Sequence, residues 1–335
     1  MENNLITGIG GFVASHLADY LLEMNEKVIG SYRWNEDLQR IKHLKEKIEM
    51  VEMDLNDLSS CVTVLKYYKP TYIYHLAAQS YVSDSFIYPV ETIRINTIGT
   101  VNLLEAIRLI RLDDASFDPI VHVCSSSEVY GLVEEKDIPI TEECRLNPSN
   151  PYAVGKVGED MAALMYWTNY RIKTIRTRMF THTGPRRTMM SAECNFARQI
   201  AEFEKKDKSF DNNPFKIGLI YNLKHGNLNS IRTWADVRDA VRAYYLLVRK
   251  CKPGEVYNIG GNTSKTIGEV LDYLISLSII KEKIKKEQDS KLLRPYDVTL
   301  QIPNCNKFIN ETGWKPIYTF EQTMQDLLNW WRENI

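Results

Sequence analysis

The stretch "NLITGIGGFVAS" (residues 4–15) decides the fold of this chain. A short apolar run ends at residue 7, and Gly8, Gly11 and Ala14 follow at GxxGxxA spacing where an amphipathic segment begins. In a dinucleotide-binding fold the first strand enters such a turn, and the next helix points its N–H groups at a pyrophosphate. The spacing alone is weak evidence, and its position directly after a first strand strengthens it. The sequence therefore predicts a dinucleotide cofactor held by Gly8, Gly11, Phe12 and Val13.

The alternation of strand and helix continues along the chain. Apolar runs of strand length are separated by segments with helical periodicity, a pattern typical of βαβ units. At 335 residues the chain is long enough for two lobes. We expect a doubly wound parallel α/β sheet (a Rossmann fold) with a smaller α/β C-terminal lobe. The expected strands are residues 4–7, 27–32, 48–54, 72–78, 120–126 and 173–180, and the expected helices are residues 13–24, 57–67, 91–111 and 151–169.

The composition excludes several classes of partner. Lysine and arginine number 42 and aspartate and glutamate 43, so the net charge of −1 gives no field that attracts nucleic acid or an anionic membrane. No apolar run is long enough for a signal peptide or a membrane span, and we expect a cytoplasmic protein. The six cysteines form no CxxC pair, so neither a metal site nor a disulfide framework is indicated.

The end of the second expected strand, "SYRWNED" (31–37), bears on the choice of cofactor. A carboxylate there hydrogen-bonds the ribose hydroxyl of NAD and repels the 2′-phosphate of NADP. Tyr32 stands where the acid would fall, and Arg33 follows it. This favours NADP, while Glu36 and Asp37 are close enough to keep NAD open.

Two further strand ends are candidates for cofactor contacts. Asp54 and Leu55 in "EMDLND" (52–57) follow the third strand, where the adenine would lie, and "LAAQS" (76–80) would pass beneath the cofactor. An ordinary strand end explains either stretch nearly as well. The residues concerned in the second stretch are Leu76, Ala77 and Ala78.

The most informative chemistry lies in two short motifs. "CSSSEVYG" (124–131) follows the apolar run "PIVHV" (119–123), which by itself reads equally as a strand leaving the core. "NPYAVGK" (150–156) puts Tyr152 and Lys156 one helical turn apart on one face. A lysine ammonium beside the phenol, with a cationic nicotinamide nearby, lowers the phenol pKa and makes Tyr152 a base near neutral pH. The glycine turn, the serine-rich strand end and the YxxxK pair are specific in combination.

On these motifs the sequence resembles an extended short-chain dehydrogenase/reductase, and within that superfamily the GDP-mannose 4,6-dehydratases and related nucleotide-sugar 4,6-dehydratases. The resemblance covers nearly the whole chain. Beyond the residues already quoted, it rests on "SSEVYG" (126–131), "GPRR" (184–187), "GNLNSIRTWADVRDAV" (226–241) and "RPYDVTLQIPNCNKFINETGWKP" (294–316).

The resemblance implies a role for each residue of the two motifs. Tyr152, supported by Lys156, would take the proton of the sugar 4-hydroxyl as hydride leaves C4, with Ser126 hydrogen-bonded to the same oxygen. Glu128 would then remove the C5 proton, water would leave from C6, and the hydride would return to C6. Ser127 together with Glu128 is the candidate proton donor to the departing hydroxyl.

The resemblance also implies where the nucleotide sugar binds. Arg232 and Arg294 are candidates for the pyrophosphate, because a guanidinium fork matches phosphate oxygens. Arg186 and Arg187 are candidates to assist them, although a surface ion pair is an equal reading for Arg187. Thr181 replaces an asparagine usual in the family at a substrate-contacting position. The remaining expected substrate contacts are Gln79, Ser80, Ser126, Glu128 and Asn227.

Domain boundaries and assembly are implied in the same way. Residues 1–180, with a returning segment at about 222–260, would form the dinucleotide-binding domain, and 181–221 with 261–335 the nucleotide-sugar lobe. Helices near 91–111 and 151–169 would pair in a homodimer. A tetramer is a weaker expectation, because "RWNEDLQRIKHL" (33–44) is shorter than the family's cofactor loop.

Other activities of the same fold stay open at this point. A C4 reductase, dehydrogenase or 4-epimerase needs only Ser126, Tyr152 and Lys156. A reductase has no C5 proton to remove, so Glu128 argues against it. A cofactor-binding regulatory protein with a vestigial site is a further alternative, which the intact Tyr–Lys–Glu set disfavours.

Overall fold

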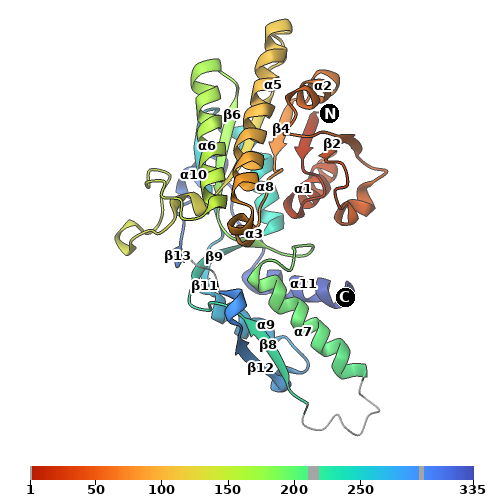
Figure 1. Cartoon of the computed structure of the whole chain (residues 1–335), viewed down its shortest axis with the longest axis vertical. Coiled ribbons are helices and arrows are strands. Elements are labelled where there is room, and N and C mark those ends of the chain that lie inside the picture. The colour runs from red at the N-terminus through yellow and green to blue at the C-terminus, as the bar shows by residue number, and fades with distance from the viewer. Residues whose placement is uncertain (1, 210–218, 294–297) are drawn as a thin grey trace.

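The protein is described by a computed structural model covering residues 2–209, 219–293 and 298–335. Figure 1 shows a large domain built on a central sheet and a smaller lobe beside it, which carries the C-terminus. None of the helices in these three ranges is long and apolar enough to cross a membrane.

Seven of the described strands form one parallel sheet in the order β10-β6-β5-β4-β1-β2-β3. The order reverses between β1 and β4, which makes their carboxyl ends the place where a doubly wound sheet binds ligands. The predicted Rossmann sheet is therefore confirmed. The strands are β1 (Asn3–Thr7), β2 (Lys27–Tyr32), β3 (Glu49–Glu52), β4 (Tyr72–His75), β5 (Ile120–Ser126), β6 (Thr174–Met179) and β10 (Val256–Ile259).

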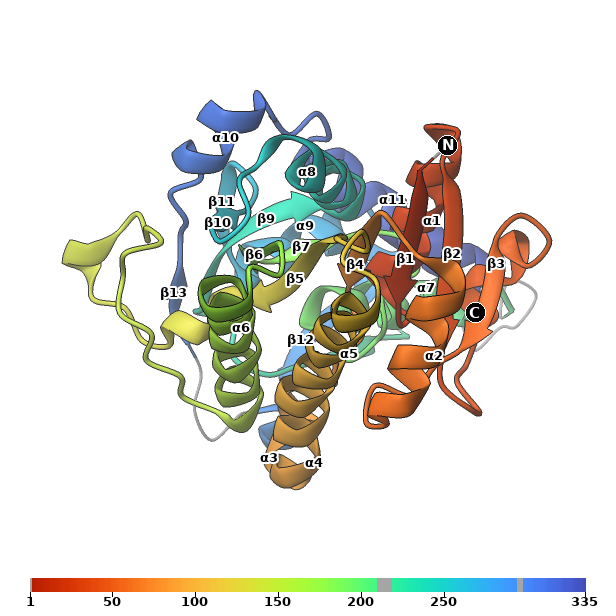
Figure 2. The same ribbon diagram turned by 90° about the horizontal axis from the view of Figure 1, so that it is seen from above.

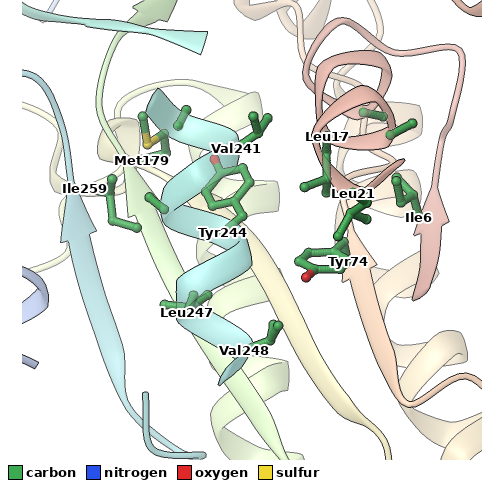
Figure 3. Packing of buried hydrophobic residues seen from close by; sticks show 14 of the residues in the cluster. Ile6, Leu17, Leu21, Tyr74, Met179, Val241, Tyr244, Leu247, Val248 and Ile259 are labelled. Carbon is green, nitrogen blue, oxygen red and sulfur yellow. The ribbon is translucent and has the colours of Figure 1, made fainter. Parts of the chain in front are cut away.

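Helices cover both faces of this sheet. Helices α1 (Phe12–Glu23) and α8 (Val237–Lys250) pack on one face. Figure 3 shows Leu17 and Leu21 of α1 and Tyr244 and Leu247 of α8 directed into one cluster with Tyr74. On the other face lie α2 (Leu58–Tyr68), α5 (Gly99–Asp113) and α6 (Pro151–Tyr170), and Figure 2 shows α5 and α6 side by side.

Two of the helical segments have interrupted or capped starts. The helix expected at 91–111 is preceded by α3 (Val82–Ile87) and is built from α4 (Pro89–Ile93), a π-helical turn (Arg94–Ile98) and α5. Asn150 caps α6, because its side chain accepts a hydrogen bond from the backbone N–H of Ala153 at 2.8 Å. Pro151 follows at the first helical position, so the segment "NPYAVGK" begins the helix.

The smaller lobe is built from short strands and three longer helices. β8 (Tyr221–His225) pairs with β12 (Ile284–Gln288), while β9 (Ile231–Asp236) pairs with β7 (His182–Thr183), β11 (Thr263–Thr266) and β13 (Leu300–Gln301). Helices α7 (Ala192–Ser209), α9 (Ile267–Ser276) and α11 (Phe320–Glu333) enclose its apolar core, and α10 (Asn306–Thr312) packs near β10. Short 3-10 turns are Gln39–Leu44, Ser127–Tyr130, Glu135–Asp137, Lys281–Lys283 and Ser290–Leu292.

The chain returns to the large sheet later than the expected position near residue 222. β8 and β9 pair within the smaller lobe, and only α8 and β10 of this stretch join the large sheet. The reason is that β9 lies antiparallel to β11 and parallel to β13, so its backbone groups are used by lobe strands.

Candidate active site

The glycine turn is shaped by close backbone packing. Gly8 has a positive φ of +69°, and a Cβ there would lie 2.9 Å from the Cα of Ala77. Thr7 Oγ1 accepts hydrogen bonds from the backbone N–H groups of Leu76 at 3.1 Å and Ala77 at 3.0 Å. The turn after β1 and the predicted "LAA" segment after β4 are therefore held against each other. This conformation requires a glycine at position 8.

The start of α1 is open toward an anion. Gly11 is the N-cap, and no described side chain caps the helix. Phe12 and Val13 form the first turn, which contains no acidic residue. Backbone N–H groups at the start of this helix lie beside Gly8, where there is no room for a side chain. Such a helix start suits a pyrophosphate.

The structure brings an acid to the glycine turn that the sequence left as an alternative. Glu36 Oε2 accepts a hydrogen bond from the backbone N–H of Arg33 at 3.0 Å, and a Cβ on Gly10 would lie 2.7 Å from Glu36 Oε1. The side chain of Arg33 is exposed. A 2′-phosphate would therefore meet Arg33 and Glu36 together, whereas a ribose hydroxyl could donate to Glu36.

Of the two residues predicted near the adenine, Asp54 is exposed and Leu55 is buried. Asp54 Oδ1 accepts a hydrogen bond from the backbone N–H of Asn56 at 2.9 Å and stabilises its own turn. Leu55 is buried in the apolar cluster under α2 and α5, and a Cβ on Gly99 would contact it at 3.3 Å. Leu55 can therefore reach a ligand only through its backbone.

Tyr152 and Lys156 lie on α6 beside the end of β5. Lys156 is buried, and its Nζ donates hydrogen bonds to the carbonyl oxygen of Cys124 and to Glu159 Oε2, both at 2.7 Å. The half-buried Tyr152 shares a hydrogen bond with Ser126. The predicted Ser–Tyr–Lys grouping is thus assembled by one strand and one helix.

The pKa of Tyr152 in the chain by itself reflects opposing effects. Burial raises the pKa of Tyr152 above its ordinary value, although Lys156 and the hydrogen bond from Ser126 act to lower it. The sequence argument counted the lysine ammonium and a cationic nicotinamide, and the loss of hydration on burial opposes both. A phenolate at this position needs the additional positive charge of a bound oxidised cofactor.

Glu128 is held by two amides from different parts of the chain. Its Oε2 accepts a hydrogen bond from Asn150 Nδ2 at 3.1 Å, and its Oε1 accepts one from Gln301 Nε2 at 3.2 Å. Ser126 Oγ accepts a hydrogen bond from the backbone N–H of Glu128 at 3.2 Å and caps the short turn that carries it. The carboxylate therefore stands in a fixed orientation next to Ser126.

The hydroxyl of Ser127 is directed at Gln301, which does not fit its expected role as a proton donor to the C6 hydroxyl. It is buried, and its hydroxyl donates to Gln301 Oε1 at 3.1 Å. Its proton is therefore committed to the amide that in turn donates to Glu128. Through Gln301, which lies in β13, the end of β5 is joined to the smaller lobe.

The predicted substrate residues of the sheet edge and lobe occupy several different places. The side chain of Gln79 folds back on Tyr81, and Ser80 is exposed. The backbone oxygen of Thr181 accepts a hydrogen bond from Ala235 at 3.0 Å. Asn227 donates to Ser230 Oγ at 3.0 Å in the turn before β9.

The four arginines expected near phosphate are not equivalent. Arg232 lies buried in β9, with one donor to the carbonyl oxygen of Ile231 at 3.1 Å. Arg186 pairs with Asp19 at 2.7 Å, on the side of α1, and Arg187 pairs with Glu193 at 2.9 Å. Arg294 lies outside the described residues.

Sequence reasoning missed Asn150, Glu159 and Gln301. Asn150 before a proline is a helix N-cap signal, and Glu159 stands three residues after Lys156, so both could have been found. Gln301 is 173 residues from Glu128, and no local pattern connects them.

Comparison with known proteins identifies the family of the chain. The family model described as GDP-mannose 4,6 dehydratase matches residues 5–327. The chain is 29% identical to GDP-6-deoxy-D-mannose reductase of Pseudomonas aeruginosa, covering 98% of this chain and 97% of that one. It is 28% identical to GDP-mannose 4,6-dehydratase of Yersinia enterocolitica, covering 98% and 93%.

Solved structures give the same picture. The structure of RMD from Pseudomonas aeruginosa complexed with NADPH superposes with a TM-score of 0.80 at 27% identity and covers all of both chains. The dTDP-glucose 4,6-dehydratase of Bacillus anthracis in complex with NAD also gives 0.80 at 27% identity, covering 100% of this chain and 97% of that one. Because the family model spans nearly all of the sequence, the chain belongs to the GDP-mannose 4,6-dehydratase family.

Proposed function

We propose that this protein is a nucleotide-sugar 4,6-dehydratase that converts a GDP-linked sugar of the mannose type into its 4-keto-6-deoxy product. The observation that carries the proposal is Glu128, whose carboxylate accepts hydrogen bonds from Asn150 and Gln301 beside Ser126. An oriented carboxylate at this position supplies the base for C5 that an elimination needs. The family match and the dehydratases among the relatives support the same reaction.

The cofactor in this proposal is NADP, with NAD as the alternative. A nicotinamide dinucleotide, when bound, supplies a ring that accepts a hydride and gives it back. The residues that would hold it are Gly8, Gly11, Phe12 and Val13 at the pyrophosphate and Arg33 at the 2′-phosphate. Glu36, held over the glycine turn, is the specific observation in favour of NAD. Identifying the nucleotide released by denaturing the purified protein decides between them.

The first step assigns Tyr152, Ser126 and Lys156 to the sugar 4-hydroxyl. Ser126, which shares a hydrogen bond with Tyr152, would hold the hydroxyl oxygen while the tyrosine oxygen accepts its proton. Lys156, fixed by the Cys124 carbonyl, would stabilise the phenolate that must exist beforehand. The product is a 4-ketone, which makes the neighbouring C5 hydrogen acidic.

The second step belongs to Glu128. Its carboxylate takes the C5 proton, and the acid so formed can protonate the C6 hydroxyl, which leaves as water. This removes the need for Ser127, whose hydroxyl hydrogen is directed at Gln301. Return of the hydride to C6 and delivery of a proton from solvent to C5 would then complete the 4-keto-6-deoxy sugar, and the proton that Tyr152 took from the 4-hydroxyl would pass to solvent in exchange.

Binding of the nucleotide part is assigned to the smaller lobe. We propose Arg232 and Arg294 for the pyrophosphate and Asn227 and Thr181 for neighbouring contacts. The Arg186 side chain is paired with Asp19 of α1 and would have to leave it to touch substrate. Gln79 and Ser80 complete the expected sugar-side contacts.

A homodimer through α4, α5 and α6 is part of the proposal. Val90 of α4, Ile98 of the π-helical turn before α5, and Val154, Met161 and Met165 of α6 are exposed, which is more apolar surface than a helix facing only water usually carries. Burying this surface against a second copy would pair these helices with their counterparts, as expected from the resemblance. A monomer by light scattering at micromolar concentration would exclude it; the tetramer and the cytoplasmic location stay predictions.

A C4 reductase is the second candidate, because one of the most similar curated relatives is a reductase. The test is to incubate the purified protein, without added cofactor, with GDP-, UDP- and dTDP-hexoses and to follow products by mass. A dehydratase gives a product lighter by one water from the GDP-hexose. A reductase leaves all hexoses unchanged and instead consumes reduced cofactor when given a 4-keto sugar, which would refute the proposal.

A further inference from the structure

Lys156 contacts an acid, Glu159, that does not belong to the expected catalytic set. Its ammonium donates to the Cys124 carbonyl oxygen and to Glu159 Oε2, each at 2.7 Å. Lys156 is 5% exposed and Glu159 is 1% exposed. An ammonium has three N–H donors, so one donor remains for Tyr152 or a bound cofactor. The two bonds therefore fix the direction of the third.

The carboxylate of Glu159 has incomplete hydrogen bonding, which is unfavourable for a residue that serves only to stabilise the fold. In the described part of the chain, its Oε1 is buried without a hydrogen-bond partner. Asp160, the next residue, uses both oxygens, pairing with Arg176 and Arg178 at 2.9 Å each. Desolvation largely offsets the attraction within a buried ion pair, and an unpaired buried oxygen adds a further cost. The acid is thus kept next to the catalytic lysine at an energetic cost.

We propose that Glu159 is a positioning residue of the hydride-transfer step: its carboxylate keeps Lys156 charged and directed toward Tyr152. This inference rests on the proposed function, in which Tyr152 exchanges a proton with the sugar 4-hydroxyl. It assigns a task to a residue three positions after the YxxxK lysine, which the motif itself does not include.

The surroundings leave few other groups that can change charge near this pair. Burial lowers the pKa of His75 on β4 and of His122 on β5 to about 3, so both are neutral. Burial raises the pKa of the Cys124 thiol, and Asp160 is paired with two arginines. Among the described residues, the charge around Tyr152 near neutral pH is therefore set by Lys156 and Glu159, together with the Glu128 carboxylate beside Ser126.

The direction of the effect follows from the charges. Burial acts to lower the pKa of Lys156, but the Glu159 carboxylate and nearby groups raise it above its ordinary value. Burial raises the pKa of Glu159 to about 7, against the opposing effect of Lys156. Without the Glu159 charge, burial dominates and the pKa of Lys156 falls. While Lys156 is still charged, the pKa of Tyr152 falls as well, because the Glu159 charge helps to raise it; once Lys156 is neutral, Tyr152 loses the charge that most lowers its pKa.

The test compares Glu159→Gln with the wild type. The first readout is the pH dependence of cofactor reduction in a single turnover with GDP-hexose. Because Lys156 loses its proton at a lower pH in this variant, the rate should fall off earlier on the alkaline side, and the optimum is expected to shift to lower pH. The matched control is Glu204→Gln, which neutralises a buried acid paired with Arg332 at 2.8 Å in the smaller lobe and should leave the optimum unchanged.

The second readout needs no activity. The melting temperature of the cofactor-free protein is measured from about pH 6 to about pH 10 for the wild type, Glu159→Gln, Lys156→Met and the double variant. In Glu159→Gln a buried lysine must be charged without a counter-ion at neutral pH. Its deficit in melting temperature should therefore shrink as the pH rises and Lys156 loses its proton. The double variant has no buried lysine and should show no such recovery.

The outcomes separate this inference from the proposed function. A Glu159→Gln profile that superposes on the wild type overturns the inference, whatever happens to stability. If Glu159→Gln cannot be purified folded, Glu159→Asp replaces it: a lower rate at the wild-type optimum supports the inference, and a wild-type rate overturns it. A protein that moves hydride but never loses water refutes the dehydratase assignment and leaves this test intact.

Discussion

Replacing Glu128 by glutamine separates the two halves of the proposed reaction. Tyr152, Ser126 and Lys156 are untouched in Glu128→Gln, so hydride should still leave C4 and a 4-ketone should form. The amide cannot accept the C5 proton, and elimination should stop. We expect the absorbance of reduced nicotinamide to rise and stay high while no dehydrated sugar appears.

The magnitude follows from the two amides that hold the carboxylate. Both Asn150 Nδ2 and Gln301 Nε2 donate to Glu128, at 3.1 and 3.2 Å, so the new NH₂ group must face one of these donors. Losing that hydrogen bond costs about 1–3 kcal/mol of stability. A domain stable by about 5–15 kcal/mol stays folded after such a loss. The expected fall in dehydration of about 10²- to 10⁴-fold must then come from the missing base.

The assay is stopped-flow absorbance of the cofactor combined with mass analysis of the sugar. Gln301→Leu is the control, since it removes one donor to Glu128 and keeps the carboxylate. It should reduce dehydration by about tenfold, corresponding to one hydrogen bond of about 1.4 kcal/mol. Near wild-type dehydration by Glu128→Gln would refute the reasoning, and so would equal loss of hydride transfer and dehydration.

Three other outcomes are expected. Tyr152→Phe should abolish cofactor reduction as well as dehydration, because the 4-hydroxyl keeps its proton; single-turnover absorbance checks this. Gly8→Ala should weaken cofactor binding about tenfold or more in a fluorescence titration, because φ is +69° and the Ala77 backbone is only 2.9 Å from the new Cβ. Burial lowers the pKa of His16 and His182 from 6.5 to about 4. The stabilisation from keeping each histidine neutral is therefore fully present above pH 6.5 and is lost as the pH falls toward 4. In denaturant titrations, the free energy of unfolding should fall across this range by up to about 1.4 kcal/mol per pH unit for each histidine.

The elements that depend on local pattern could be predicted from the sequence. The glycine turn and the alternation of apolar runs predicted the parallel sheet, because its central strands are largely buried on both faces and contain apolar runs; the edge strand β3 is only partly buried. Tyr152 and Lys156 were found because helical spacing alone puts them on one face. Their pKa values could not be found in this way, since the loss of hydration that raises the pKa of Tyr152 depends on the complete fold.

Contacts between distant segments mark the limit of that reasoning. Gln301 belongs to a two-residue strand that joins β9, and only this pairing delivers its amide to Glu128. Similarly, Glu36 reaches Gly10 because the loop after β2 folds back over the glycine turn. No local pattern gives either contact, so the sequence favoured Arg33 for the cofactor, with Glu36 left as an alternative, and gave Ser127 together with Glu128 as the proton donor.

The two acids of the site divide the chemistry by their surroundings. Glu128 is half-buried and held by neutral amides, so it can give and take a proton without disturbing another charge. Glu159 is enclosed and paired with Lys156, so any change in its charge alters the lysine and, through it, the tyrosine. Environments that differ in this way allow two carboxylates to serve separate steps in one site. Elimination at C5 should therefore be altered without hydride transfer in the Glu128 variant. A change at Glu159 should act first on hydride transfer at C4 and, because elimination needs the 4-ketone, on the later step through it.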